Sequence, residues 1–363
     1  MASLLSLPPL PLVRAVDRLR GLLGTTYRAL VPGHVALLEM LGAGFLTQAI
    51  HAAAELGVAD ALADGPRDGA ELARTVGADE DALRRLMRLL TSEGIFAEDK
   101  GGKYTLTPMA QPLRSDCEVS LRDTALFFGS TVHREHWSHL VDAVRTGEPV
   151  GEALDGMPFF DLVRKDRSLG EIFDRGMTSI GSLSLEPLLA AYDFGAFETI
   201  VDIGGGEGTM IAEILGKAPQ SKGVLVDLPE VAQSARTRLA ELGLANRCAV
   251  ESGSFFESVP EGGDAYLLKH VLHDWSDDDA GRILGTVHRA MCPHARLLII
   301  ELVVPEDDQP HPSKFIDLEM LVNTGGRERT EAEYREFLAE HGFTLTRVVP
   351  TVSPNNILEA RLS

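Results

Sequence analysis

The sequence predicts an α/β protein with a doubly wound, mostly parallel sheet in its C-terminal half and a mainly helical, winged-helix-like N-terminal half. The candidate strands are short β-branched runs that alternate with helical segments, at residues 199–203, 223–226, 248–251, 265–268, 297–304 and 344–349. Strands separated by helices form a parallel sheet with helices on both faces. In the N-terminal half, apolar residues such as Leu37, Leu41 and Phe45 recur at the spacing of amphipathic helices. A chain of 363 residues suits two domains, which we place at residues 1–185 and 186–363.

A winged-helix shape is predicted within the N-terminal half. Residues 69–90 contain two short helices, and residues 94–106 contain a hairpin that turns at two glycines. DNA binding is the obvious function of that shape. The exposed side of the second helix, however, offers only Arg84, Arg85 and Arg88 among acidic neighbours, whereas DNA recognition needs a basic surface. We therefore expect this region to serve in packing or dimerisation.

Charge and cysteine usage narrow the functional classes. Lys and Arg number 34 against 54 Asp and Glu, a formal net charge of −20, so most of the surface would repel nucleic acid. Cys117, Cys248 and Cys292 are odd in number and far apart, which excludes a disulfide scaffold and a cysteine-rich zinc module. Polar residues interrupt the most apolar long stretch, residues 35–62, so we expect a cytoplasmic protein without a membrane span.

The strongest local signal is the glycine-rich run at residues 201–209, Val-Asp-Ile-Gly-Gly-Gly-Glu-Gly-Thr, which follows the first strand of the sheet. Glycines let the backbone turn sharply and approach a ligand, and the next helix points its free N–H groups at the same place. The run does not match the dinucleotide fingerprint, because Thr209 stands where a third glycine is needed. No Gly-Lys-Ser/Thr follows, so it is not a phosphate-binding P-loop either.

Asp227 ends the next strand, about 20 residues after the glycine turn, and a carboxylate in that place can accept hydrogen bonds from two ribose hydroxyls. The alternative is a helix N-cap, because Pro229 and Glu230 follow. Together with the glycine turn, this acid favours a ligand that contains a ribose. The missing third glycine argues against a pyrophosphate beside it.

A segment with two histidines, residues 270–275, closes the fourth strand at the carboxyl edge of the sheet, where ligands of such sheets bind. A histidine there can act as a general base because its pKa lies near neutral pH, although a strand-end histidine can also be purely structural. Glu301 and Glu328 are acids that could orient the imidazole through its second nitrogen. The following Ser276 and Asp279 have the spacing of a helix capping box.

Two other clusters have both a functional and a structural interpretation. His133, His136 and His139 could suggest a metal site, but no thiolate or carboxylate accompanies them at matching helical spacing, so we expect no metal. An apolar, aromatic group between residues 157 and 177 is interpreted as core, part of which could wall a pocket for a flat ring.

Residues 201–209, Asp227, residues 269–275 and residues 325–330 together resemble the plant-caffeate type of S-adenosylmethionine-dependent O-methyltransferases and their bacterial relatives in antibiotic and polyketide tailoring. The combination of Leu-Lys-His with His-Asp-Trp is highly specific. The resemblance runs from about residue 44 onward and implies a Rossmann-like methyltransferase sheet with an N-terminal dimerisation domain. It also implies a homodimer in which each subunit helps to close its partner's pocket.

The resemblance implies a set of contacts to S-adenosylmethionine and to its product, S-adenosylhomocysteine. Gly204 would lie against the methionine part, Asp227 would hold the ribose hydroxyls, and Lys269 would contact the cofactor at the strand end. Ser254 and Phe255 would border the adenine. The family usually has an acid where this chain has Ser254, so an uncharged hydroxyl replaces a carboxylate beside the adenine.

The resemblance also implies catalytic and substrate residues. His273 would take the proton from the acceptor hydroxyl, with Glu301 and Glu328 flanking it. The positions that border the substrate in the family match Phe173, Met177 and Asn323. The implied activity is methyl transfer to a phenolic or enolic hydroxyl of an aromatic small molecule. Two alternatives stay open: a relative that keeps the cofactor but performs another tailoring reaction, and a winged-helix regulator that senses a small molecule.

Overall fold

The computed structural model describes residues 7–117 and 119–363, which divide into two compact units. The first, here called the helical unit, contains residues within 22–141 and 152–183. The second, the sheet unit, contains residues within 7–21, 142–151 and 184–363. The predicted domains, residues 1–185 and 186–363, stay a prediction. The compact units follow a different division, because the chain passes between them more than once.

The helical unit contains the pair of short helices and the hairpin that the sequence predicts. Helix α5 (Gly69–Val76) begins at the capping residue Asp68 and ends at Gly77, whose φ of 70° is left-handed. Helix α6 (Glu80–Ser92) begins at the capping residue Asp79. Each aspartate accepts a backbone N–H that has no partner inside the helix, which fixes where the helix starts. The small sheet consists of β1 (Arg67–Asp68), β3 (Lys103–Leu106) and β2 (Phe96–Glu98), in that order.

The remaining helices before residue 183 belong to the helical unit or continue across a unit boundary. They are α1 (Leu10–Ala29), α2 (Gly33–Leu41), α3 (Ala43–Glu55), α4 (Val58–Ala61), the 3₁₀ helix η1 (Gln111–Leu113), α7 (Arg122–Gly129), α8 (Thr131–Ser138), α9 (Leu140–Thr146), α10 (Gly151–Asp155), α11 (Phe159–Lys165) and α12 (Arg167–Ser182). Within the described chain, residues 33–55 are the one helical stretch that is long and apolar enough by composition to cross a membrane, and most of it is exposed. The same composition suits a helix face that packs on another protein surface.

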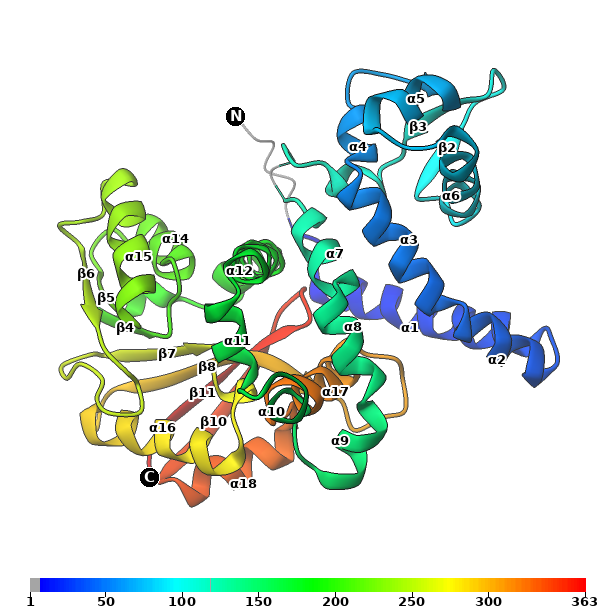
Figure 1. The fold of residues 1–363 in the computed structure, drawn as a ribbon. Coiled ribbons are helices and arrows are strands. Elements are labelled where there is room, and N and C mark those ends of the chain that lie inside the picture. The colour runs from blue at the N-terminus through cyan, green and yellow to red at the C-terminus, as the bar shows by residue number, and fades with distance from the viewer. Residues whose placement is uncertain (1–6, 118) are drawn as a thin grey trace. The chain divides into compact units, whose positions relative to one another are not determined.

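The sheet unit is built on one mixed sheet with the order β10-β11-β8-β7-β4-β5-β6, and β9 pairs with β8 (Figure 1). Its strands are β4 (Thr199–Ile203), β5 (Lys222–Asp227), β6 (Cys248–Ser252), β7 (Ala265–Lys269), β8 (Arg296–Val304), β9 (Arg329–Thr330), β10 (Phe343–Pro350) and β11 (Asn355–Leu362). Strands β4 to β8 are parallel, and β11 is antiparallel to both of its neighbours. The chain extends the sheet from β4 to one side through β5 and β6, and then to the other through β7 and β8. The switch point, where ligands bind in such sheets, therefore lies between β4 and β7.

Helices cover both faces of this sheet (Figure 1). They are α13 (Leu185–Ala191), the 3₁₀ helices η2 (Phe194–Ala196) and η3 (Leu272–Asp274), α14 (Thr209–Lys217), α15 (Pro229–Glu241), α16 (Asp277–Ala290), α17 (Ser313–Asn323) and α18 (Glu331–Glu340). Ser276 caps α16 by accepting the Asp279 N–H at 3.2 Å, so the start predicted for this helix is confirmed. A reciprocal capping box between Thr330 and Glu333 starts α18.

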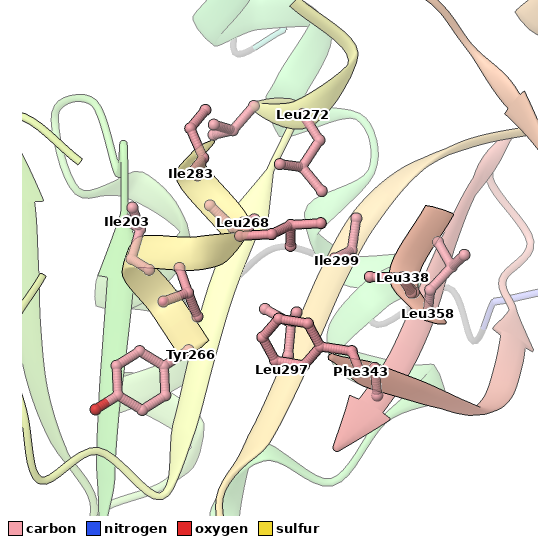
Figure 2. Close-up of a cluster of buried hydrophobic side chains, with 14 of the residues drawn as sticks. Ile203, Tyr266, Leu268, Leu272, Ile283, Leu297, Ile299, Leu338, Phe343 and Leu358 are labelled. Atoms are coloured by element: carbon pink, nitrogen blue, oxygen red, sulfur yellow. The ribbon is translucent and has the colours of Figure 1, made fainter. Parts of the chain in front are cut away.

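Each face of the sheet carries its own apolar core. Figure 2 shows side chains of β7, β8, β11 and α18 converging on one layer, with Leu268, Ile299 and Leu338 among them. Leu267 and Ile300, the neighbours of two of these residues in sequence, point to the opposite core, which α13, α14 and α15 complete. Alternation along a strand explains this division. Burial on both faces explains why these strands are continuous apolar runs.

The six predicted strands are confirmed to within one residue at each end, as β4 to β8 and β10. Strand β11 was not predicted. Residues 355–362 read Asn-Asn-Ile-Leu-Glu-Ala-Arg-Leu, and this mixture of polar and apolar residues lacks the apolar run of its neighbours. Its pairing with β8 and β10 supplies the order that local propensity does not.

Candidate active site

The glycine turn lies at the carboxyl end of β4, beside the switch point. Gly204, Gly206 and Gly208 have left-handed φ angles of 67°, 59° and 81°, which glycine adopts at little cost. Gly205 has no room for a side chain, because a Cβ would lie 2.8 Å from Asp202 Oδ2. Among the described residues, open space surrounds the position that a Cβ of Gly206 would take. The backbone of the turn is therefore accessible to a ligand.

Asp202 is the acid beneath this turn. It is buried, and in the part of the chain that the structure describes its Oδ2 has no hydrogen-bond partner. Burial raises the pKa of Asp202 to about 7, a rise that Lys269 opposes and Asp227 increases. Because buried acceptors are nearly always satisfied, an unpartnered oxygen at this edge fits a ligand that donates a hydrogen bond.

Asp227 ends β5, and its carboxylate ties the glycine turn to that strand. Its Oδ2 accepts the Gly206 N–H at 2.8 Å, and its Oδ1 accepts the Leu228 N–H at 2.7 Å. Burial raises the pKa of Asp227, although both N–H groups lower it. Each carboxylate oxygen keeps a further acceptor position. The residue can thus hold two ribose hydroxyls while it holds the turn.

Ser254 and Phe255 follow β6 at the same edge. The ring of Phe255 lies 3.5 Å from the position that a Cβ of Gly204 would take, so these two predicted cofactor residues are neighbours. The hydroxyl of Ser254 accepts the Phe256 N–H at 3.3 Å. Phe255 and Phe256 both pack edge-on against Trp275. This apolar surface suits an adenine ring.

Two residues with basic side chains close β7. Burial lowers the pKa of Lys269, and the negative charge of Asp202 opposes that change. His270 has a φ of 52°, a left-handed conformation that is uncommon outside glycine. Burial, together with the charges of Lys269 and His273, lowers the pKa of His270 well below its usual value. The neutral ring lies 2.8 Å from Asn355 Oδ1 through its Nε2, and this contact helps to hold the strained turn that leads to His273.

His273 lies in η3, is buried, and has three carboxylates around it. Glu328 Oε1 is 2.8 Å from its Nδ1, and Asp274 Oδ1 is 3.6 Å from its Nε2. Glu301 Oε1 accepts the backbone N–H of His273 at 3.1 Å. The two predicted acids therefore act on different parts of the residue: Glu328 orients the ring, and Glu301 fixes the main chain.

These carboxylates decide the charge of the imidazole. Burial by itself lowers the pKa of His273, but the charge of Asp274, then the hydrogen bond and charge of Glu328 and the charge of Glu301, outweigh burial and raise it to about 10. Burial raises the pKa of Asp274 to about 6 and also raises the pKa of Glu328, and His273 opposes both changes. The negative charge around the ring therefore favours the imidazolium form of His273.

The loop before β9 packs directly on the backbone of η3. The Arg327 N–H donates to the carbonyl of His273 at 2.9 Å. Gly326 has no room for a side chain, because a Cβ would clash with that carbonyl oxygen. The Glu328 N–H donates to Asp317 Oδ1 of α17 at 2.9 Å. Main-chain contacts on both sides thus set the position of Glu328 against the imidazole.

The three predicted substrate residues fall in different units. Asn323 is buried at the end of α17 in the sheet unit, where its amide donates to Glu319 Oε1 at 2.9 Å. Phe173 and Met177 lie on α12 in the helical unit and pack on a cluster that includes the buried Phe127 and Phe159. Their contact with a substrate stays a prediction.

Two further features fit structural roles. His136 Nε2 lies 2.7 Å from Asp155 Oδ2, and His133 packs edge-on against the ring of Phe127. No set of three or more His, Cys, Asp or Glu side chains is arranged for a metal within residues 7–117 and 119–363. A cavity of about 520 Å³ lies at the amino edge of the parallel strands. There Arg347 donates to Glu359 Oε2 at 2.8 Å, so the charges of this cavity pair with one another.

Sequence reasoning missed Asp202, Asp274 and Tyr334. An acid inside an otherwise apolar strand, two residues before Gly204, is a signal that could have found Asp202, and adjacency to His273 could have found Asp274. The hydroxyl of Tyr334 donates to Glu301 Oε2 from a different element, 33 residues along the chain. No local sequence pattern predicts such a contact.

Comparison with known proteins agrees with this geometry. Residues 137–344 match the family model of the O-methyltransferase domain, and residues 38–116 match the O-methyltransferase dimerisation domain. The chain is 40% identical over 331 residues to the phenazine O-methyltransferase PhzM of Lysobacter antibioticus, which covers 91% of this chain and 97% of the relative. It is similar to the crystal structure of LaPhzM, with a TM-score of 0.86, 40% identity, and coverage of 92% of this chain and 100% of the other.

Two other similar proteins show the chemistry that this fold carries. The crystal structure of NcsB1, an O-methyltransferase from neocarzinostatin biosynthesis, contains S-adenosylmethionine and 2-hydroxy-5-methyl naphthoic acid. It has a TM-score of 0.76, 34% identity, and coverage of 88% of this chain and 96% of the other. A relative from Streptomyces purpurascens is named aclacinomycin 10-hydroxylase RdmB. It is 35% identical over 314 residues, 85% of this chain and 84% of the relative.

The family match covers more than half of the chain, and the glycine turn, the unpartnered Asp202 oxygen and Asp227 fit a nucleoside cofactor with a cationic group. The chain therefore belongs to the O-methyltransferase family and uses S-adenosylmethionine as its cofactor.

Proposed function

We propose that this enzyme methylates a phenolic or enolic hydroxyl of an aromatic small molecule and that His273 accepts the proton of that hydroxyl. The observation that carries the proposal is the 2.8 Å contact of His273 Nδ1 with Glu328 at the carboxyl edge of the sheet. The relative named for phenazine and the naphthoic acid bound to NcsB1 support an aromatic acceptor. Labelled methyl donor with a panel of hydroxylated phenazines, naphthoates and quinones, read by mass spectrometry, tests the substrate class.

The cofactor supplies a methyl group that its sulfonium already activates. On our proposal, Gly204 and the unpartnered oxygen of Asp202 face its methionine part, and Asp227 accepts its ribose hydroxyls. Phe255 covers the adenine, and Ser254 offers a neutral hydroxyl where the resemblance leads us to expect an acid. Lys269 closes the strand end. The protein must then align the acceptor oxygen with the methyl group and remove one proton.

The hydrogen bond to Glu328 determines which ring nitrogen of His273 can accept the proton. A carboxylate accepts, so Nδ1 carries the hydrogen and Nε2 is the nitrogen that takes the proton. The imidazolium formed in that step is stabilised by the same acids that surround the ring, because opposite charges at short distance favour the charged form. In the free enzyme the ring must first lose its proton, so the reactive fraction grows as pH rises.

The apolar surface of the N-terminal helices supports a homodimer. Leu38 and Phe45 are 69% and 77% exposed and lie in the region that matches the dimerisation domain. Helix α1 carries a further stripe at helical spacing: Leu12, Val16, Leu19 and Leu23, each at least 45% exposed. Large apolar side chains gathered on an exposed surface are typical of interfaces. We propose that a second copy covers it, and that the enzyme works in the cytoplasm without a nucleic-acid or membrane partner.

The relative named as a hydroxylase supports a second candidate function. In that function the enzyme keeps the cofactor but catalyses another tailoring reaction. The ring contact between His273 and Glu328 favours methyl transfer in this chain.

Replacing His273 by Gln should lower kcat by about 10² or more, because the amide keeps one hydrogen bond but cannot take a proton. Calorimetry should show cofactor affinity within a few fold of wild type. His294→Gln is the matched control, since His294 is 74% exposed and lies at the other edge of the sheet. Two acceptors of different acidity should be compared. Full rate on the less acidic one would exclude His273 as the base.

Asp274→Asn should move the pH profile of kcat/KM to lower pH. The base works when neutral, so activity rises with pH through the pKa of His273, which Asp274 helps to raise to about 10. Removing that charge lowers this pKa by about 1 to 3. Profiles between pH 6 and 10 check it, with Asp279→Asn, at a half-exposed acid of α16, as control. Identical profiles in all three proteins would contradict the assignment.

Asp227→Asn should weaken both S-adenosylmethionine and S-adenosylhomocysteine by roughly 1.5 to 3 kcal/mol, the range for hydrogen bonds to a charged group. Calorimetry measures the change. Asp193→Asn is the control, because Asp193 also accepts a backbone N–H but starts η2, away from the glycine turn. Equal affinities in wild type and Asp227→Asn would remove Asp227 from the cofactor site.

Light scattering should give a mass about twice the 39.2 kDa of one chain. The double variant Leu38→Lys/Phe45→Lys should shift it toward one chain at micromolar concentration, because each lysine must be buried against the partner. Leu242→Lys, at a 55% exposed apolar side chain of the sheet unit, should leave the mass unchanged. A wild-type mass near 39 kDa would refute the homodimer.

A further inference from the structure

A buried polar chain runs behind His273, on the side of its main chain. Glu301 of β8 and Tyr334 of α18 are both fully buried. Glu301 accepts the His273 N–H through Oε1 and the hydroxyl of Tyr334 through Oε2. Both oxygens of the Glu301 carboxylate therefore accept a hydrogen bond, one from the backbone of His273 and one from the side chain of Tyr334.

Buried Arg329 lies next to this chain. Its guanidinium is 5.8 Å from the ring centre of Tyr334 and 4.4 Å from that of Phe337. It donates to Asp277 Oδ1 at 2.5 Å. Burial lowers the pKa of Arg329, but Tyr334, Asp277 and Glu301 outweigh it and keep the guanidinium charged. The positive charge interacts with Glu301 and Asp277 and so balances part of the acidic cluster.

The start of α18 fixes where the Tyr334 ring points. Thr330 accepts the Glu333 N–H at 3.2 Å, and Glu333 Oε2 accepts the Thr330 N–H at 2.7 Å. This reciprocal cap sets the first turn of the helix, and Tyr334 is the next residue. Because aromatic side chains have few rotamers, the hydroxyl is held on Glu301 by the backbone.

We propose that Tyr334 is a positioning residue for His273, acting through Glu301. Its hydroxyl holds the Glu301 carboxylate in place, so that this carboxylate keeps both the His273 N–H and its charge near the imidazole. The inference rests on the proposed function of His273 as the base. Nothing in the reaction itself requires Tyr334 to touch cofactor or acceptor.

Tyr334→Phe removes one oxygen and keeps the ring. Glu301 then loses a donor in a buried place, and its carboxylate is free to turn away from His273. This movement weakens the negative charge near the imidazole. The other groups that face the ring, Asp274, Glu328 and His270, stay unchanged. The pKa of His273 should therefore fall. On the high-pH plateau, where the ring is neutral in both proteins, kcat should drop about tenfold because the ring is less firmly positioned, the effect of one hydrogen bond to a charged group. KM for donor and acceptor should stay within about twofold.

NMR titration of labelled histidine rings in the resting enzyme reads this effect without turnover, and His273→Gln assigns the signal. Tyr266→Phe is the matched control. Tyr266 is also fully buried in the same core, but its hydroxyl contacts Gly263, Pro260 and Ala290. The control should lower Tm without moving the His273 titration.

The outcomes separate the two proposals. A lowered His273 titration and a lowered kcat in Tyr334→Phe, absent in Tyr266→Phe, support the positioning role. If Tyr334→Phe loses only thermal stability, as the control does, the inference is overturned while His273 can remain the base. If His273→Gln keeps full rate, the proposed function fails, whatever the titration shows.

Discussion

The structure around the active site depends on one constraint, the negative charge of three carboxylates gathered at a single imidazole. A buried carboxylate without a partner costs several kcal/mol, so each must find donors. Glu328 takes the Nδ1–H of His273, and Glu301 takes a backbone N–H and the hydroxyl of Tyr334. Asp274 is partly exposed and lies near Nε2. The elements that supply these donors are thereby fixed around η3.

This requirement explains features that look unrelated in the sequence. Gly326 is small because the loop carrying Glu328 presses on the carbonyl of His273. Arg329 is buried because the acids behind the imidazole need a cation. His270 holds a left-handed backbone and a neutral ring, since a second imidazolium beside His273 and Lys269 would add repulsion to the strain.

Periodicity and glycine spacing were enough to predict the parallel sheet and candidate residues at its carboxyl edge, because these follow from local chemistry. Asp227 ends a strand and the two-histidine segment follows one, as the strand pattern predicts, whereas the resemblance singled out Lys269 and His273. The distinct roles of Glu301 and Glu328 could not be predicted, because they depend on which oxygen meets the ring and which meets the main chain. Strand β11 and the contact of Tyr334 with Glu301 were not predicted for a related reason, since both are fixed by partners distant in sequence.

The raised pKa of His273 poses a chemical question that the same electrostatics answers. With a pKa raised to about 10, the imidazolium is the favoured form at pH 7, whereas proton transfer is most efficient when the pKa of a base lies near the working pH. On our proposal that His273 is the base, the carboxylates raise its basicity and also favour its protonated form. A positive charge brought to the same edge opposes the imidazolium, as Lys269 and His273 already do for His270. S-adenosylmethionine carries such a charge on its sulfonium and S-adenosylhomocysteine does not. On the same proposal, this acidic cluster would suit a cationic methyl donor, whose charge would lower the pKa of His273 toward neutral pH.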